Sequence, residues 1–333
     1  MASHIGRRKF LATLGGAAAM WPLAAQAQQP DRMRRIGVLI PLAENHPEAQ
    51  PRAMAFQRAL QELGWTEGRN VHIDYRFAAS AERILAHATE LVALAPDVVV
   101  GTSTAVVTAF RQATRSIPIV FIGVMDPVGQ GLVPSLAQPG GDMTGFGLEE
   151  PSMGGKWLAL LNAIAPRVAR IAVVFNPETA PFAGLFLPSI DAAGHSLTIE
   201  PIVSPVRTEA ELERAIAEVG RDQLGGVIVL PDPFTAAHRE LIIALAAHHR
   251  LPAVYPLRSF AASGGLIAYG IDRIDLHRRA ASYVDRILKG TKVADLPIQM
   301  PTKFEFVINM QTARALGLEV PAQLLATVDE VIE

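Results

Sequence analysis

The sequence predicts an α/β fold made of two similar lobes, each a doubly wound parallel sheet, joined by a hinge. Short apolar runs rich in β-branched residues alternate with longer amphipathic stretches, which is typical of parallel strands covered by helices on both faces. Four of these strand-like runs recur later in the same order and at nearly constant spacing. The length of 333 residues also suits two domains rather than one.

The first lobe is expected to contain four strands and three helices. In chain order these are a strand at 35–41, a helix at 48–63, a strand at 71–75, a helix at 80–94, a strand at 97–101, a helix at 103–114 and a strand at 117–122. The strands are mostly continuous apolar runs, which indicates burial on both faces of a sheet. Gly64 suits a helix end and Ser80 suits an N-cap.

The second half of the chain repeats this pattern. The run at 170–177 follows the first strand by 135 residues, the run at 225–231 follows the third by 129, and the run at 251–256 follows the fourth by 134. The segment 197–203 stands where a second strand is expected. Four segments in register predict two lobes of similar construction.

The domain boundaries are placed where the first copy of the strand–helix pattern ends and the second begins. A glycine-rich stretch at 140–147 precedes an expected helix at 152–163, and a long helix at 272–288 and a proline-punctuated stretch at 296–301 indicate further crossings. We expect lobe one to hold 33–146 plus about 272–300, and lobe two 147–271 plus about 301–333. Several crossings would act as a hinge about a cleft.

The amino terminus predicts an exported protein. Arg7-Arg8-Lys9 precedes an apolar stretch at 11–25, and Ala25-Gln26-Ala27 supplies small residues for cleavage near Ala27, so residues 1–27 are typical of a twin-arginine signal peptide. The stretch is shorter than the roughly 20 apolar residues of a spanning helix. With no cysteine in the chain, neither a lipid-modified cysteine nor a disulfide is expected. We expect a freely diffusing, monomeric protein in the periplasm.

Composition and motifs exclude several function classes. Net charge is −2, and no cluster of lysine and arginine lies beyond the signal, so nucleic-acid binding is not expected. No glycine-lysine-serine/threonine run indicates a P-loop, and the glycine pairs lack the third glycine of a dinucleotide fingerprint. No cofactor is expected. The histidines His238, His248 and His249 form no His-x-x-x-His pair and are expected to be solvated, so no metal site is expected.

Ligand contacts are expected beyond the carboxyl ends of the strands, where open parallel sheets bind ligands. The loops at these ends supply the candidate ligand-binding residues, which are Leu42, Ala43, Glu44, Gly101, Thr102, Ser103, Thr104, Val124, Asp126, Asn176, Glu178, Thr179, Asp232 and Tyr255.

Two of these loops carry complementary chemistry. A glycine and three hydroxyl residues at 101–104 precede a helix, so free N–H groups and hydroxyls could hold a carboxylate; the alternative is that Thr102 or Ser103 only caps the helix. Asp126 could pair with an ammonium, or it could simply form an Asp-Pro turn. An anion cradle and an acid together suit a zwitterion such as an amino acid.

The remaining candidates each have a structural alternative. Glu44, Glu178 and Asp232 could be solvated or could cap helices, and Tyr255 could line the site or belong to the core. Phe182 and Phe234 are two further aromatic candidates for a site wall, with the same core alternative.

Two other functions remain as alternatives. Residues 101–105 come near the G-x-S-x-G nucleophile elbow, which would make the chain an exported α/β hydrolase using Ser103. However, the late histidines, including His277, lie in helical stretches rather than in strand-end loops. A cytoplasmic ligand-sensing regulator would need a DNA-binding headpiece where the signal lies.

Several segments together resemble the ABC-transporter substrate-binding family that includes tryptophan/tyrosine-binding proteins. They are Ile36-Gly37-Val38-Leu39, Leu60 to Trp65, Gly68 to Val71, Ile117 to Phe121, Asp126-Pro127-Val128, Pro139 to Phe146, Val307 to Met310, Ala315 to Leu318 and Pro321. The resemblance covers essentially all of the chain after the signal. It implies a type I periplasmic-binding-protein fold with three crossings between the lobes, and delivery of a ligand to an ABC permease in the inner membrane.

The resemblance also implies roles for two of the loops. Asp126 would meet the ligand's ammonium, and Thr102, Ser103 and Thr104 would meet its carboxylate. An aromatic amino acid is the leading expectation for the ligand, and a branched-chain amino acid, an amide or a small carboxylate remains open.

Overall fold

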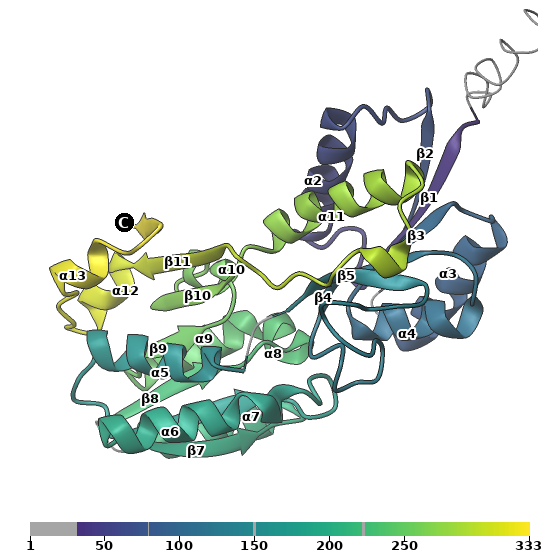
Figure 1. Cartoon of the computed structure of the whole chain (residues 1–333). Helices are drawn as coiled ribbons and strands as arrows, with labels where there is room; N and C mark the ends of the chain where they lie inside the picture. The colour runs from purple at the N-terminus through teal and green to yellow at the C-terminus, as the bar shows by residue number, and fades with distance from the viewer. Residues whose placement is uncertain (1–31, 79, 149–150, 222–223) are drawn as a thin grey trace, which may run out of the picture.

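The computed structural model describes residues 32–333 apart from 79, 149–150 and 222–223, and it confirms two α/β lobes built on parallel sheets (Figure 1). The expected signal peptide at 1–27 lies outside the described residues. Within the described part of the chain, every helix is too short or too polar to cross a membrane.

Lobe one contains a five-stranded parallel sheet with the order β2-β1-β3-β4-β5. Its elements are β1 (Arg34–Ile40), α2 (Ala49–Glu62), β2 (Val71–Phe77), α3 (Ala81–Ala93), β3 (Val98–Thr102), α4 (Thr104–Ala113), β4 (Ile119–Val124) and β5 (Met143–Gly147). The sheet is covered on both faces: Val98 and Val100 of β3 pack in one apolar cluster with α2, whereas Val99 packs with α3 and α4. This alternation explains why the strand is apolar throughout.

Lobe two contains a seven-stranded sheet with the order β12-β11-β10-β9-β8-β6-β7. Its elements are α5 (Met153–Ile164), β6 (Arg170–Phe175), η1 (Ala183–Leu185), α6 (Leu187–Leu197), β7 (Glu200–Pro205), α7 (Glu209–Gly220), β8 (Gly225–Val229), α8 (Pro233–Ala237), α9 (Arg239–His248), β9 (Ala253–Tyr255), α10 (Arg258–Ala262), β10 (Ile267–Ile271), β11 (Phe304–Asn309), α12 (Met310–Ala315), α13 (Ala322–Leu325) and β12 (Glu330–Ile332). The order β7-β6-β8-β9-β10 repeats that of lobe one, and β11 adds to β10 in the antiparallel sense.

Each lobe has a fifth parallel strand that the apolar pattern did not reveal. A Cβ on Gly145 of β5 would lie 2.0 Å from the carbonyl oxygen of Phe121, and a Cβ on Gly270 of β10 would lie 1.9 Å from that of Pro256. Only glycine allows such close backbone approach. These glycines make both strands less apolar than a typical buried strand.

The chain passes between the lobes three times. It leaves lobe one after β5 and returns after β10 as α11 (Arg273–Leu288), which packs along α2 (Figure 1). A short helix, η2 (Val293–Asp295), follows, and Gln299 then bonds along β5 before the chain enters β11.

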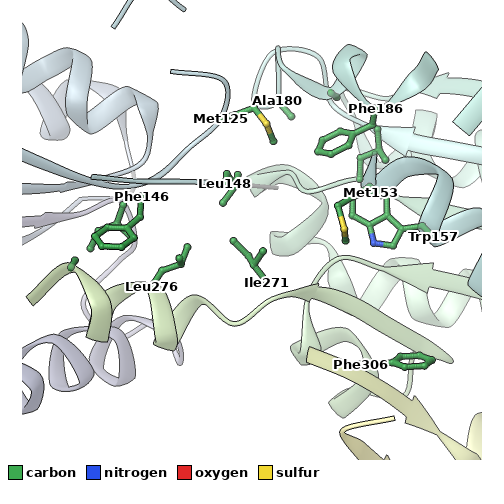
Figure 2. Close-up of a cluster of buried hydrophobic side chains, with 14 of the residues drawn as sticks. Met125, Phe146, Leu148, Met153, Trp157, Ala180, Phe186, Ile271, Leu276 and Phe306 are labelled. Carbon is green, nitrogen blue, oxygen red and sulfur yellow. The ribbon is translucent and has the colours of Figure 1, made fainter. Parts of the chain in front are cut away.

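The crossing segments share an apolar core. One cluster of buried side chains includes residues of both lobes and of the segments between them. In Figure 2, Leu148, Ile271 and Leu276 lie between Phe146 on one side and Trp157 on the other. The lobes are therefore connected by packed side chains as well as by the backbone.

Candidate functional site

The loop between β3 and α4 holds a strained serine at the carboxyl edge of the first sheet. Ser103 has a φ of 114°, outside the usual range for a residue with a Cβ. Its hydroxyl accepts the N–H of Val106 at 3.5 Å, so Ser103 is the N-cap of α4, as the capping alternative proposed. Thr102 is buried and donates its hydroxyl to the Leu39 carbonyl at 3.2 Å, whereas Thr104 stays partly exposed.

The next strand end carries a second residue with a left-handed backbone. Asp126 has a φ of 41° and is exposed. Its Oδ1 accepts the N–H of Gly129 at 2.9 Å, so one oxygen holds the turn. Because β3 and β4 are neighbours in the sheet, the loops bearing Ser103 and Asp126 leave the same edge side by side.

In lobe two, a buried carboxylate joins two strand-end loops. Asp232 accepts the N–H of Asn176 at 2.7 Å, the N–H of Phe234 at 2.9 Å and the hydroxyl of Thr179. Burial raises the pKa of Asp232, and these hydrogen bonds, led by that from Thr179, oppose the rise. The carboxylate is fully occupied within the protein, so its placement favours the capping alternative over direct contact with a ligand ammonium.

The other sequence candidates are spread between core and surface. Tyr255 is 1% exposed and stacks on Phe260 with ring centroids 4.7 Å apart, so it belongs to the core of lobe two. Val124 and Gly101 are buried as well, and Leu42 packs partly against the core. Ala43, Glu44 and Glu178 are exposed, and Glu178 pairs with Arg207 at 3.1 Å.

Two aromatic side chains remain partly accessible near the strand ends of lobe two. Phe182 follows β6 and is half-buried, and Phe234 lies in the first turn of α8 with its ring 4.1 Å from that of His238. Each ring packs on one side against a cluster of buried apolar side chains. They supply apolar surface at the carboxyl edge of the second sheet.

A charged cluster that sequence reasoning missed lies where the two lobes meet. Glu48 precedes α2 and forms an ion pair with Arg52, which is only 7% exposed. The Glu48 carboxylate also lies close to the Ser259 hydroxyl in α10 of lobe two. Arg273 and His277, in the first turns of α11, lie against this pair. Residues from the ends of β1, β9 and β10 thus meet at one place.

The charges in the cluster perturb one another. Burial raises the pKa of Glu48, but Arg52 and Arg273 outweigh it and hold that pKa below its usual value. Burial and repulsion by Arg273 lower the pKa of Arg52 to about 10. Burial, followed by the charge of Arg52, lowers the pKa of His277 to about 3, so this histidine is neutral at pH 7.

The helix pattern contained a signal for this cluster. The buried face of α2 is formed by Ala49, Ala53, Phe56 and Leu60, and Arg52 falls on the same face. A charged residue within the apolar stripe of an amphipathic helix is unusual and indicates a buried ionic contact.

The geometry lends no support to the hydrolase alternative. The Ser103 hydroxyl accepts the N–H of Val106, and among the described residues no histidine or carboxylate is hydrogen bonded to it; a nucleophile would need such a base. The described residues also contain no group of three or more histidine, aspartate or glutamate side chains arranged to hold a metal ion.

Comparisons with known proteins agree on one family. A family model described as ABC transporter substrate binding protein matches residues 35–332. A tyrosine-binding protein of Clostridioides difficile (strain R20291) is 26% identical over 294 residues, which cover 88% of this chain and 84% of that protein.

Solved structures give the same result. A conserved domain protein from Vibrio cholerae O1 biovar El Tor is 28% identical, with a TM-score of 0.80 over 90% of this chain and 100% of that one. A Streptococcus pneumoniae ABC domain in complex with L-Trp has a TM-score of 0.79 and 24% identity, over 90% of this chain and 99% of that one. At that identity the second comparison bears on the fold alone.

Proposed function

Because this chain belongs to the family of ABC transporter substrate binding proteins, we propose that it captures a small zwitterion, an amino acid, between its two lobes. The ligand is then delivered to an ABC permease in the inner membrane. The opening and closing that this requires would use the three crossings as a hinge, with lobe one formed by 33–146 plus about 272–300, and lobe two by 147–271 plus about 301–333.

The observation that carries this proposal is the backbone at two neighbouring strand ends. Of the described residues other than glycine, five have a positive φ, and Ser103 and Asp126 are two of them. Strain of this kind costs of order 1–3 kcal/mol for each residue and is concentrated at functional sites. Here it presents a hydroxyl and a carboxylate from adjacent loops at the edge where parallel sheets bind ligands.

An aromatic side chain on the ligand is supported by the opposite lobe. Phe182 and Phe234 offer partly exposed rings near the ends of β6 and β8. Aromatic rings attract one another by about 0.5–1.5 kcal/mol beyond their buried area. The relative named above as a tyrosine-binding protein supports the same class of ligand.

Location in the periplasm is part of the proposal. The twin-arginine pair Arg7-Arg8, the apolar stretch and the Ala25-Gln26-Ala27 site indicate export and cleavage near Ala27. A substrate-binding protein must meet its ligand outside the inner membrane, so the signal and the family agree.

A thermal-shift screen of the exported protein against the common amino acids and small carboxylates tests the function. A ligand present at about 100 times its dissociation constant adds about 2.7 kcal/mol of stability, which is a clear rise in the melting temperature. We expect L-tryptophan or L-tyrosine to give the largest rise. If no amino acid moves the melting temperature, the amino-acid proposal is wrong.

A further inference from the structure

The cluster at the lobe junction contains more positive than negative charge. Arg52 and Arg273 contribute two positive charges and Glu48 one negative charge, while His277 is neutral at pH 7 because its pKa is lowered to about 3. One positive charge therefore remains unmatched among these four groups. Arg52 is buried and Arg273 is partly buried, so a counter-ion beside them would offset the cost of holding this charge away from water.

The cluster also contains buried polar atoms that lack hydrogen-bond partners. The Nε of Arg273 is buried and has no hydrogen-bond partner, so it is a donor that an anion can satisfy, whereas the unpartnered Nε2 of neutral His277 is an acceptor and needs a donor instead. His277 is 3% exposed, and its Nδ1 donates to the backbone carbonyl of Arg273 at 2.7 Å. Arg52 is already paired with Glu48, whereas the Arg273 side chain forms no ion pair with a described residue. Buried polar atoms without partners are rare in folded proteins and indicate a missing group.

The cluster lies on the side of the lobes where a ligand is proposed to bind. Glu48 ends the loop that follows β1, Ser259 lies just after β9, and Arg273 follows β10 directly. β9 and β10 are parallel neighbours, so Ser259 and Arg273 follow the carboxyl edge of the sheet of lobe two, whereas Glu48 follows the carboxyl end of β1 in the sheet of lobe one. Glu48 of lobe one and Ser259 of lobe two lie close together here.

We infer that Arg273, supported by Arg52, receives the carboxylate of the bound ligand; this rests on the proposed function and names the partner of one of the ligand's two charges. A guanidinium matches a carboxylate with two parallel N–H···O bonds. A single carboxylate also balances the one unmatched charge. The assignment moves the carboxylate away from the hydroxyl loop at 102–104, where Thr102 donates to the Leu39 carbonyl and Ser103 caps α4.

The test pairs a change in the protein with the matching change in the ligand. Calorimetry measures binding of L-tryptophan, L-tyrosine and their carboxamides, which lack the negative charge, to the wild-type protein and to Arg273→Gln. We expect Arg273→Gln to weaken binding of the amino acids by about 30-fold or more, as for loss of a buried charge partner. It should change binding of the carboxamides by less than about threefold.

Two further variants separate charge from structure. Arg273→Lys keeps the charge without the planar fork and should recover part of the lost affinity. Arg278→Gln changes an exposed arginine of the same helix, paired with Asp275, and should bind like the wild-type protein.

The outcomes are distinct. If the wild-type protein binds the amino acids and Arg273→Gln binds them equally well, the carboxylate lies elsewhere and the inference is overturned while the proposed function stands. If the wild-type protein binds none of the amino acids, the proposed function fails and the inference fails with it. Sodium acetate and sodium chloride are tested alone. If they stabilise the wild-type protein but not Arg273→Gln, and amino-acid binding is unchanged by the substitution, the cluster holds a free anion and the inference is overturned.

Discussion

The buried histidine of α11 gives a pH dependence of stability whose size can be calculated. His277 lies beside Arg52 of α2 and Arg273 of its own helix, and Glu48 pairs with Arg52. Burial, followed by repulsion from Arg52, lowers the pKa of His277 from 6.5 to about 3 in the folded protein. Between these two values the unfolded chain takes up a proton that the folded protein does not.

The sign and magnitude follow from this difference. Since the folded pKa is depressed, the stability contributed by neutral His277 is complete above pH 6.5 and is lost progressively as the pH falls toward 3. A pH of 5 lies 1.5 units below the pKa of 6.5 that the histidine has in the unfolded chain. At about 1.4 kcal/mol per unit, the free energy of unfolding at pH 5 is therefore about 2 kcal/mol lower than at pH 8.

Urea unfolding at pH 8 and pH 5, followed by tryptophan fluorescence, measures this loss. His277→Asn keeps a donor for the Arg273 carbonyl but does not titrate, so it should lose about 2 kcal/mol less stability than the wild-type protein between the two pH values. His248→Asn, at an exposed position of α9, should follow the wild-type protein.

Equal losses in His277→Asn and in the wild-type protein would refute the reasoning. The histidine would then be protonated in the folded state, or hydrated, and would not be the neutral buried group described above. The comparison uses only the difference between two pH values. Any cost of the smaller asparagine side chain is therefore subtracted.

Three more outcomes are expected from the site and the fold. Asp126→Ala should lower the affinity for an amino acid by about 2 kcal/mol or more, because the ligand ammonium loses its partner; unchanged affinity in calorimetry would remove Asp126 from the site. Asp232→Ala should reduce the free energy of unfolding by about 3 kcal/mol, because it leaves buried donors of two loops unpaired, and a loss below about 1 kcal/mol in chemical denaturation would contradict this. Gly270→Ala should destabilise lobe two by about 3 kcal/mol, because its Cβ would meet a backbone carbonyl; Gly184→Ala, where a Cβ has open space, is the matched control, and equal melting temperatures for the two variants would argue against the clash.

The predicted strands were those whose signal is local. A strand covered on both faces must be apolar at every position, so the cores of β1, β3, β4, β6 and β8 could be found from composition alone. The recurrence of these runs then gave the two lobes, because equal folds require equal spacing between equivalent strands.

The missed strands have a different physical requirement. β5 and β10 contain Gly145 and Gly270 because the neighbouring backbone approaches too closely for a side chain. That constraint arises from packing between strands and leaves no apolar run along the chain. The antiparallel pairing of β11 with β10 could not be predicted from the sequence either, since it depends on where the chain re-enters lobe two after the third crossing.

Some features of the candidate site could be predicted from the sequence, and others could not. The positions of Ser103 and Asp126 at strand ends could be predicted, because a strand followed by a helix fixes where the loop lies. Their backbone conformations could not, and neither could the burial of Asp232 and Tyr255. Whether a polar side chain faces a ligand or its own protein depends on neighbours that are distant in sequence.

By itself, the sequence determined the fold class and the repeat, and it predicts an export signal and the loops from which a ligand contact can come, because each of these depends on residues close together in the chain. Only the tertiary structure decided which of those loops keep free polar groups. The tertiary structure alone also brought Glu48 and Arg52, at the start of α2, close to Arg273 and His277 of α11. These residues are more than 200 positions apart, and the charge balance that they create exists only after the chain has crossed between the lobes and packed one helix along the other.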